Sequence, residues 1–106
     1  MKIAIATIGK KEDAEISGRG GRAPYYLIFN EKGEFIETIS NPFATGGGGA
    51  GFSVAKMLAD KGVDIFVAGV MGGNMAGALK ERGLEFREKT GKAEEVAREI
   101  ADSFND

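Results

Sequence analysis

Four consecutive glycines, Gly46 to Gly49, restrict the fold of this chain more than any other feature. A glycine inside a helix or strand costs roughly 0.5–1 kcal/mol relative to alanine, so this run predicts a loop. The residues that follow have apolar side chains at the spacing of one helical face: Phe52, Ala55, Leu58 and Ala59. Gly62 suits the C′ position that ends such a helix. A glycine loop at a helix N-terminus gathers backbone N–H groups at the positive end of the helix dipole. The stretch therefore predicts either an anion-binding loop or a flexible connection alone.

The composition excludes several classes of protein. A length of 106 residues predicts a single domain over residues 1–106. The chain has no cysteine and no histidine, which excludes a disulfide framework and a thiolate metal site. Its net charge of −2 provides no broad attraction to nucleic acid or to an anionic membrane. Its apolar runs are too short to span a bilayer, and the N-terminus has no signal-peptide pattern. We therefore expect a cytoplasmic protein with no nucleic-acid or membrane partner.

Apolar runs and glycine-containing turns predict the element order βββαβαβα. Helices are expected between the glycine run and Gly62, at 75–82 and at 93–104, and strands at 2–8, 23–30, 35–40, 64–70 and 84–87. Gly83 is expected to stop the second helix. In the last helix, Val96, Ile100 and Phe104 are expected on the core side. Its charged residues are expected to face water: Glu94, Glu95, Arg98, Glu99 and Asp102.

This order predicts an α/β layer fold with a mixed sheet. Right-handed crossovers place the first and fourth strands, which are the most apolar, side by side in the middle. With the second strand antiparallel to the other four, the loops at 9–22, 41–50 and 71–74 all follow carboxyl ends of strands. Open α/β sheets bind their ligands at that edge. Three glycine-rich loops are therefore expected to meet at a binding site.

The expected ligand-binding residues are the basic and glycine residues of these loops, together with one asparagine: Arg19, Arg22, Gly46, Gly47, Gly48, Gly49, Gly51 and Asn74. A guanidinium donates hydrogen bonds in a fork that suits a carboxylate, a phosphate or an anionic cluster. Each choice has a structural alternative. Arg22 could pair with a carboxylate, Asn74 could cap the second helix, and Met71 and Met75 are expected to fill the core.

No catalytic and no metal-binding residues are expected. A nuclease of the ribonuclease H type needs carboxylates clustered on its central strands, and the run 2–8 contains none. A Ser–His arrangement is impossible without histidine. The glycine run lacks the Lys-Ser/Thr of a P-loop, and a GxGxxG match within it lies outside a βαβ unit.

Over nearly its whole length, the chain resembles the dinitrogenase iron–molybdenum cofactor biosynthesis family, which includes the nitrogenase accessory factor. The resemblance rests on the order and spacing of segments at residues 2–6, 17–26, 41–42, 48–51, 58–64, 68–69, 83 and 90–91. It implies a three-layer ribonuclease H-like fold with strand order 3-2-1-4-5. It also implies a small non-catalytic carrier that binds an anionic ligand or a metal–sulfur cluster precursor.

The chain departs from the family pattern at its expected ligands. Family members often carry His-Phe where this chain has Arg19 and Gly20, and many have a histidine or cysteine near Thr45. Iron and molybdenum clusters are bound through thiolate or imidazole, and the methionines offer only a weak thioether. The alternative is therefore a protein-interaction domain that docks a partner enzyme and binds no cluster, whereas a small-molecule enzyme is the least supported reading. In either case we expect the loops at 18–21 and 46–49 to be mobile without ligand.

Overall fold

A computed structural model describes residues 1–46 and 48–105 of the chain, and the expected ligand residue Gly47 lies outside them. The element order agrees with the sequence analysis. The elements are β1 (Lys2–Thr7), β2 (Tyr25–Asn30), β3 (Phe35–Ser40), α1 (Ala50–Asp60), β4 (Ile65–Ala68), α2 (Gly73–Glu81), β5 (Glu85–Glu88) and α3 (Ala93–Asn105).

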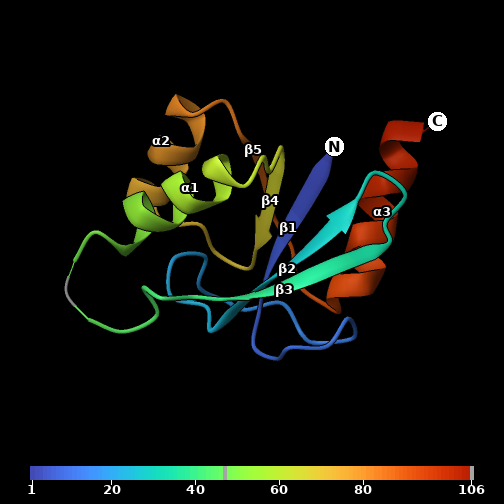
Figure 1. The fold of residues 1–106 in the computed structure, drawn as a ribbon, viewed down its shortest axis with the longest axis horizontal. Helices are drawn as coiled ribbons and strands as arrows, with labels where there is room; N and C mark the ends of the chain where they lie inside the picture. Colours follow the sequence, from blue (N-terminus) through green and yellow to red (C-terminus); the bar gives the residue numbers. More distant parts are fainter. Residues whose placement is uncertain (47, 106) are drawn as a thin grey trace.

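The five strands form one sheet in the order β3-β2-β1-β4-β5 (Figure 1). β2 runs antiparallel to β1 and β3, whereas β1, β4 and β5 are parallel. The expected order and strand directions are therefore confirmed. The carboxyl ends of β1, β3, β4 and β5 all lie at one edge of the sheet, which we call the loop edge.

Two hydrophobic clusters make the structure three-layered, as expected (Figure 1). One cluster joins α1 and α2 to the sheet face that carries Ala4, Ala6 and Phe66. The other joins α3 to the opposite face, which carries Ile3 and Ile5. β1 and β4 are buried on both faces because they lie between these layers, which explains their continuous apolar sequences.

Two aromatic residues expected in the core are exposed. Phe52 is 53% exposed, because the buried face of α1 consists of Ala50, Val54, Ala55 and Leu58. At 100° per residue, Phe52 lies well outside that face. Phe104 is 50% exposed and lines a surface hollow with Met1 and Ile65, at the edge of the sheet opposite the loop edge. Burial of α3 ends with Ile100 and Ala101 in the described side chains.

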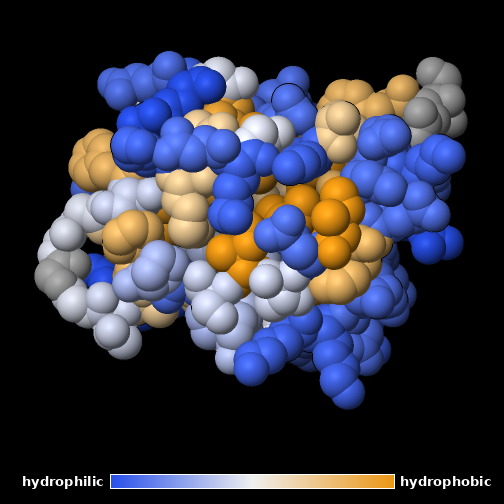
Figure 2. Space-filling model, viewed as in Figure 1, coloured by the Kyte–Doolittle hydropathy of each residue, from blue (hydrophilic) through white to orange (hydrophobic). Residues whose placement is uncertain are grey.

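The two edge strands differ in character. Three of the four residues of β5 are charged. β3 instead has exposed apolar side chains at Phe35 and Ile36, and apolar surface is visible over this part of the molecule (Figure 2). In the described part of the chain, no helix is long and apolar enough to cross a membrane.

Candidate functional site

The loops after β1 and β4 are joined by backbone hydrogen bonds at the loop edge. Gly69 N–H donates to the Ser17 carbonyl at 2.8 Å, and Gly20 N–H donates to the Val70 carbonyl at 2.9 Å. The Ser17 hydroxyl is buried, and it accepts a hydrogen bond from Arg19 N–H at 3.1 Å. The segment 17–20 is therefore held in a defined shape that presents Arg19 at the edge.

Glycines at this edge allow backbones to approach closely. A Cβ on Gly69 would lie 2.8 Å from Gly18 Cα, and one on Gly21 would lie 3.3 Å from Gly51 Cα. A Cβ on Gly51 would lie 3.1 Å from Met75 Cβ. These contacts bring the first turns of α1 and α2 together behind the 17–22 loop. Gly51 therefore serves the packing of two helix N-termini rather than presenting itself to a ligand.

A shallow pocket of about 220 Å³ lies between the 17–22 loop and the turn after β4. Its lining is mostly glycine backbone, with two arginines and two apolar side chains: Gly18, Arg19, Gly20, Gly21, Arg22, Val70, Met71 and Gly72. The structure thus brings together Arg19 and Arg22, as expected. We call this hollow the arginine pocket.

The two arginines have different surroundings. Arg19 is exposed, and no carboxylate of the described residues lies within ion-pair distance of it. Arg22 is half-buried, and its Nη1 donates to the Phe43 carbonyl at 3.2 Å and the Gly46 carbonyl at 3.5 Å. Arg22 therefore connects the loop after β1 to the loop after β3 through the carbonyls of Phe43 and Gly46.

The N-termini of α1 and α2 both open at the loop edge, and no described side chain caps either helix. The N-cap residues are Gly49, with φ of 87°, and Gly72, with φ of 80°. Neither helix has an acidic residue in its first turn, so no carboxylate within either helix offsets the partial positive charge at its N-terminus. Because α2 begins at Gly73 rather than Met75, Asn74 lies inside its first turn and the capping role considered for it is wrong.

The remaining expected ligand residues lie apart from the arginine pocket. Asn74 is exposed and does not line it. Gly46, Gly48 and Gly49 are also exposed, and no atom of the described residues beyond their chain neighbours lies within 4 Å of the place a Cβ would take. Met71 and Met75 are buried in the core, as expected.

Sequence reasoning missed a buried polar pair beneath the pocket, formed by Tyr26 and Asn41. The Tyr26 hydroxyl donates to the Gly20 carbonyl at 2.6 Å and accepts from Asn41 Nδ2 at 3.0 Å. Burial raises the pKa of the Tyr26 hydroxyl well above its ordinary value, outweighing the opposing effect of the Asn41 hydrogen bond. Tyr26 therefore remains a donor. The detectable signal was a polar residue, Asn41, immediately after the last residue of a strand.

Glu88 was also missed, because the fifth strand was expected to end at Arg87. Its carboxylate accepts a hydrogen bond from Met71 N–H at 2.8 Å. The bond holds the turn after β4 against the end of β5, and it places a negative charge beside the arginine pocket.

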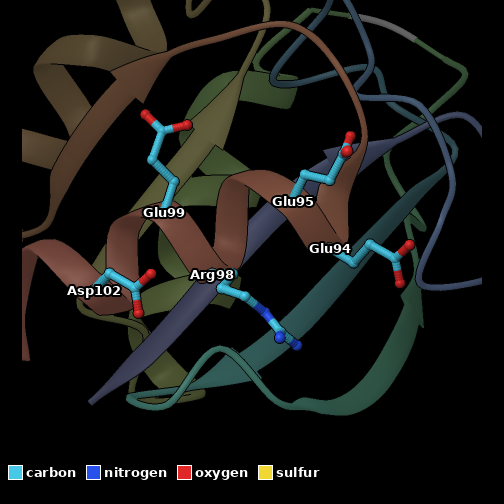
Figure 3. Close-up of a pocket in the computed structure, with 5 residues that line it drawn as sticks. All are labelled: Glu94, Glu95, Arg98, Glu99 and Asp102. Carbon is cyan, nitrogen blue, oxygen red and sulfur yellow. The ribbon is translucent and has the colours of Figure 1, made fainter.

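A hollow of about 640 Å³ lies elsewhere, on the surface of α3. It is lined by five charged residues of α3, whose side chains spread away from the helix rather than converge (Figure 3). All five are exposed, as expected from the sequence: Glu94, Glu95, Arg98, Glu99 and Asp102. Among the described residues, no group of three or more acidic side chains could hold a metal ion.

A model of the family described as dinitrogenase iron-molybdenum cofactor matches residues 1–103. This chain belongs to that family. The resemblance expected from the order and spacing of segments along the whole chain is therefore confirmed. A comparison with curated proteins finds no match.

Solved structures share the fold of this family member. A Thermotoga protein, TM1290, with a provisional NifB designation and a place in the DUF35 family, is 30% identical, with a TM-score of 0.74 over 98% of this chain and 86% of its own. The apo form of the orange protein from Desulfovibrio gigas is 23% identical, with a TM-score of 0.88 over 96% of this chain and 88% of its own. PH0822 is 17% identical, with a TM-score of 0.81 over 97% of this chain and 92% of its own.

The residues of this family member do not fit direct ligation of an iron–molybdenum cluster. The sequence has no thiolate and no imidazole to bond iron or molybdenum. Its sulfur atoms belong to four methionines. Met71 and Met75 are buried, Met57 is half-buried on α1, and Met1 begins the chain at the opposite edge of the sheet. Any cluster bound at the loop edge must therefore be held by hydrogen bonds and charge.

Proposed function

We propose that this chain is a non-catalytic binding module that holds an anionic ligand at the loop edge. The observation that carries the proposal is the arginine pocket, where Arg19 and Arg22 lie beside the uncapped N-terminus of α2. Backbone N–H groups and guanidinium groups together are suited to anions. Among the described residues that line the pocket, none has a nucleophilic or carboxylate side chain, which supports binding rather than catalysis.

Within this proposal the ligand residues have separate roles. Arg19 is the direct contact, Arg22 holds the loop after β3 in place, and the first-turn amides of α1 and α2 supply further donors. Gly46, Gly48 and Gly49 give backbone access, Gly51 lets the first turns of α1 and α2 pack closely, and Asn74 is an outer contact. The ligand class is a multiply charged anion, such as a metal–sulfur cluster precursor that brings its own complete set of ligands.

The test is a chemical-shift titration of the 15N-labelled protein with phosphate, molybdate and tetrathiomolybdate. We expect shifts at Gly18–Arg22 and Gly72–Met75, and we expect them to be lost in Arg19→Ala. The matched control is Arg82→Ala, which removes the same charge from an exposed position just beyond the far end of α2. Shifts that centre on another face, or none with any of the three anions, would contradict the proposal.

A second candidate, the docking of a partner protein at the same edge, is favoured by one observation. Three large apolar side chains at this edge are strongly exposed: Ile8 at 59%, Phe52 at 53% and Val70 at 60%. Ile8 directly follows β1, Val70 follows β4, and Phe52 lies in the first turn of α1.

This candidate is tested by partner capture with surface variants. Capture should be lost with Phe52→Ser and Val70→Ser together, and kept with the control Ile36→Ser on β3. A partner that still binds the double variant docks on another face.

A further inference from the structure

The buried pair Tyr26 and Asn41 binds carbonyl groups of the 17–23 segment. Tyr26 Oη donates to the Gly20 carbonyl at 2.6 Å. Asn41 Nδ2 donates to the Ala23 carbonyl at 2.8 Å and to the Gly21 carbonyl at 3.2 Å. Tyr26 is 0% and Asn41 8% exposed, so these polar groups are desolvated and depend on their hydrogen bonds. The pair thus holds the backbone that lines the arginine pocket from below.

The same asparagine also holds the loop after β3. Asn41 Oδ1 accepts from Phe43 N–H at 2.8 Å, and Arg22 Nη1 donates to the carbonyl of Phe43 at 3.2 Å. Phe43 is therefore held through its N–H by one residue and through its carbonyl by another. Asn41 N–H also donates to the Pro24 carbonyl at 3.0 Å. Hydrogen bonds thus cross between the two loops in both directions.

Pinning these carbonyls determines where the neighbouring N–H groups point. In a trans peptide unit, the C=O and the following N–H point in opposite directions, and the described peptide bonds are all trans. With the Gly20 and Gly21 carbonyls turned down onto Tyr26 and Asn41, the N–H groups of Gly21 and Arg22 point away from this buried pair. Two successive N–H groups that turn toward one side make an anion-binding concavity.

We propose that Tyr26 and Asn41 are positioning residues that join the 17–23 and 41–46 loops into one unit and aim the Gly21 and Arg22 amides at an anion. The affinity part of this inference rests on the proposed function, whereas the coupling of the loops does not. A residue chosen for packing alone at position 26 would be phenylalanine, because the ring already packs at 5.7 Å from Phe66. The Tyr26 hydroxyl adds the hydrogen bonds to the Gly20 carbonyl and from Asn41 Nδ2, which phenylalanine cannot make.

The test compares Tyr26→Phe with the matched control Tyr25→Phe. Tyr25 is the preceding residue of β2, half-buried, with its ring near Lys10. Amide exchange is measured without ligand at Gly20 and Phe43, with Ile5 and Val67 as core references. Phosphate and molybdate affinities are then measured by titration.

In Tyr26→Phe we expect exchange to rise roughly fivefold at both Gly20 and Phe43, the size of one lost hydrogen bond. The core references should remain unchanged, and anion affinity should fall by a similar factor. Tyr25→Phe should change neither quantity. A rise confined to Gly20, with Phe43 unaffected, would overturn the coupling.

A second variant keeps the test decisive if Tyr26→Phe lowers the protection of the core. Asn41→Ser removes both the amide donor and the Oδ1 that accepts from Phe43 N–H, and it leaves the Tyr26 hydroxyl bond to Gly20 in place. The decisive amide is therefore Gly20, where we expect exchange to rise, and unchanged exchange at Gly20 overturns the coupling. Wild-type protein that binds neither anion would overturn the proposed function and the affinity part, while the exchange data would still decide the coupling.

Discussion

At the scale of single residues, Gly69 shows how little room the loop edge leaves. A Cβ at this position would lie 2.8 Å from Gly18 Cα and 3.1 Å from the Ser17 carbonyl oxygen, and both are backbone atoms that cannot rotate away. We predict that Gly69→Ala lowers the free energy of unfolding by about 1–3 kcal/mol, the usual cost of overpacking. Chemical denaturation measures this change.

The control for this prediction is Gly77→Ala. Gly77 is exposed inside α2, with no atom within 4 Å of the place a Cβ would take. There alanine should raise the free energy of unfolding by roughly 0.5–1 kcal/mol through helix propensity. Equal effects of the two substitutions would show that crowding at Gly69 is unimportant.

Replacing Glu88 is expected to strengthen anion binding, whereas Arg19→Ala is expected to weaken it. Its carboxylate accepts from Met71 N–H, and a glutamine carbonyl oxygen can accept the same bond. Glu88→Gln should therefore keep the turn after β4 and remove a repulsive charge beside the arginine pocket. We expect phosphate and molybdate affinity to rise by roughly two- to fivefold, the range for an exposed charge interaction. Titration calorimetry measures it, and a fall in affinity would place the anion elsewhere.

At the scale of elements, the two glycine loops differ more than their sequences suggest. The 17–20 segment is tied to β1 and to the turn after β4 by hydrogen bonds from Ser17, Gly20 and Gly69 N–H groups. Gly46, Gly48 and Gly49 are exposed, and the part of the chain that the structure describes places no other segment within 4 Å of the position a Cβ would take. The sequence predicts that both loops are mobile without ligand, whereas the hydrogen bonds of the 17–20 segment favour order in the first loop.

We predict slow amide exchange at Ser17 and Gly20 and fast exchange at Gly46, Gly48 and Gly49 in the free protein. Local opening is easier where few contacts resist it. Equal protection in both loops would show that the 46–49 segment is preformed. If the prediction holds, ordering that segment on a ligand costs roughly 1–2 kcal/mol per residue, so a small anion that uses it should bind weakly.

At the scale of the whole molecule, stability should be concentrated in β1 and β4. Both strands lie in the middle of the sheet and are covered by helices on each face, whereas β3 and β5 are edge strands. We predict that the amides of Ile5 and Val67 exchange only through global unfolding, with a free energy equal to that from chemical denaturation. Amides of β5 should exchange through smaller openings. Faster exchange in β1 than in β5 would contradict this distribution.

Local sequence determined the elements and much of their arrangement. Apolar runs marked β1 and β4 as strands, and β2 and β3 fall within the strands expected at 23–30 and 35–40, which were expected to run antiparallel. Gly62 and Gly83 follow the ends of α1 and α2 with φ of 78° and 77°, as expected of C′ glycines. The strand order follows because right-handed crossovers leave few ways to place two buried strands between a hairpin and an edge. The predicted strand order also placed Arg19 and Arg22 at the loop edge.

Tertiary structure alone decided which side chains and backbone groups bind one another at the loop edge. Asn41 reaches Ala23 across 18 residues and Tyr26 across 15, and Arg22 reaches Phe43 across 21. Glu88 reaches Met71 across 17. It likewise left Phe52 exposed, because the start of α1 turned Gly51 rather than the aromatic ring toward α2. Periodicity records which face of an element is apolar. Which carbonyl a side chain binds depends instead on how distant backbone segments approach one another, and at the loop edge glycines such as Gly69 and Gly21 allow a close approach.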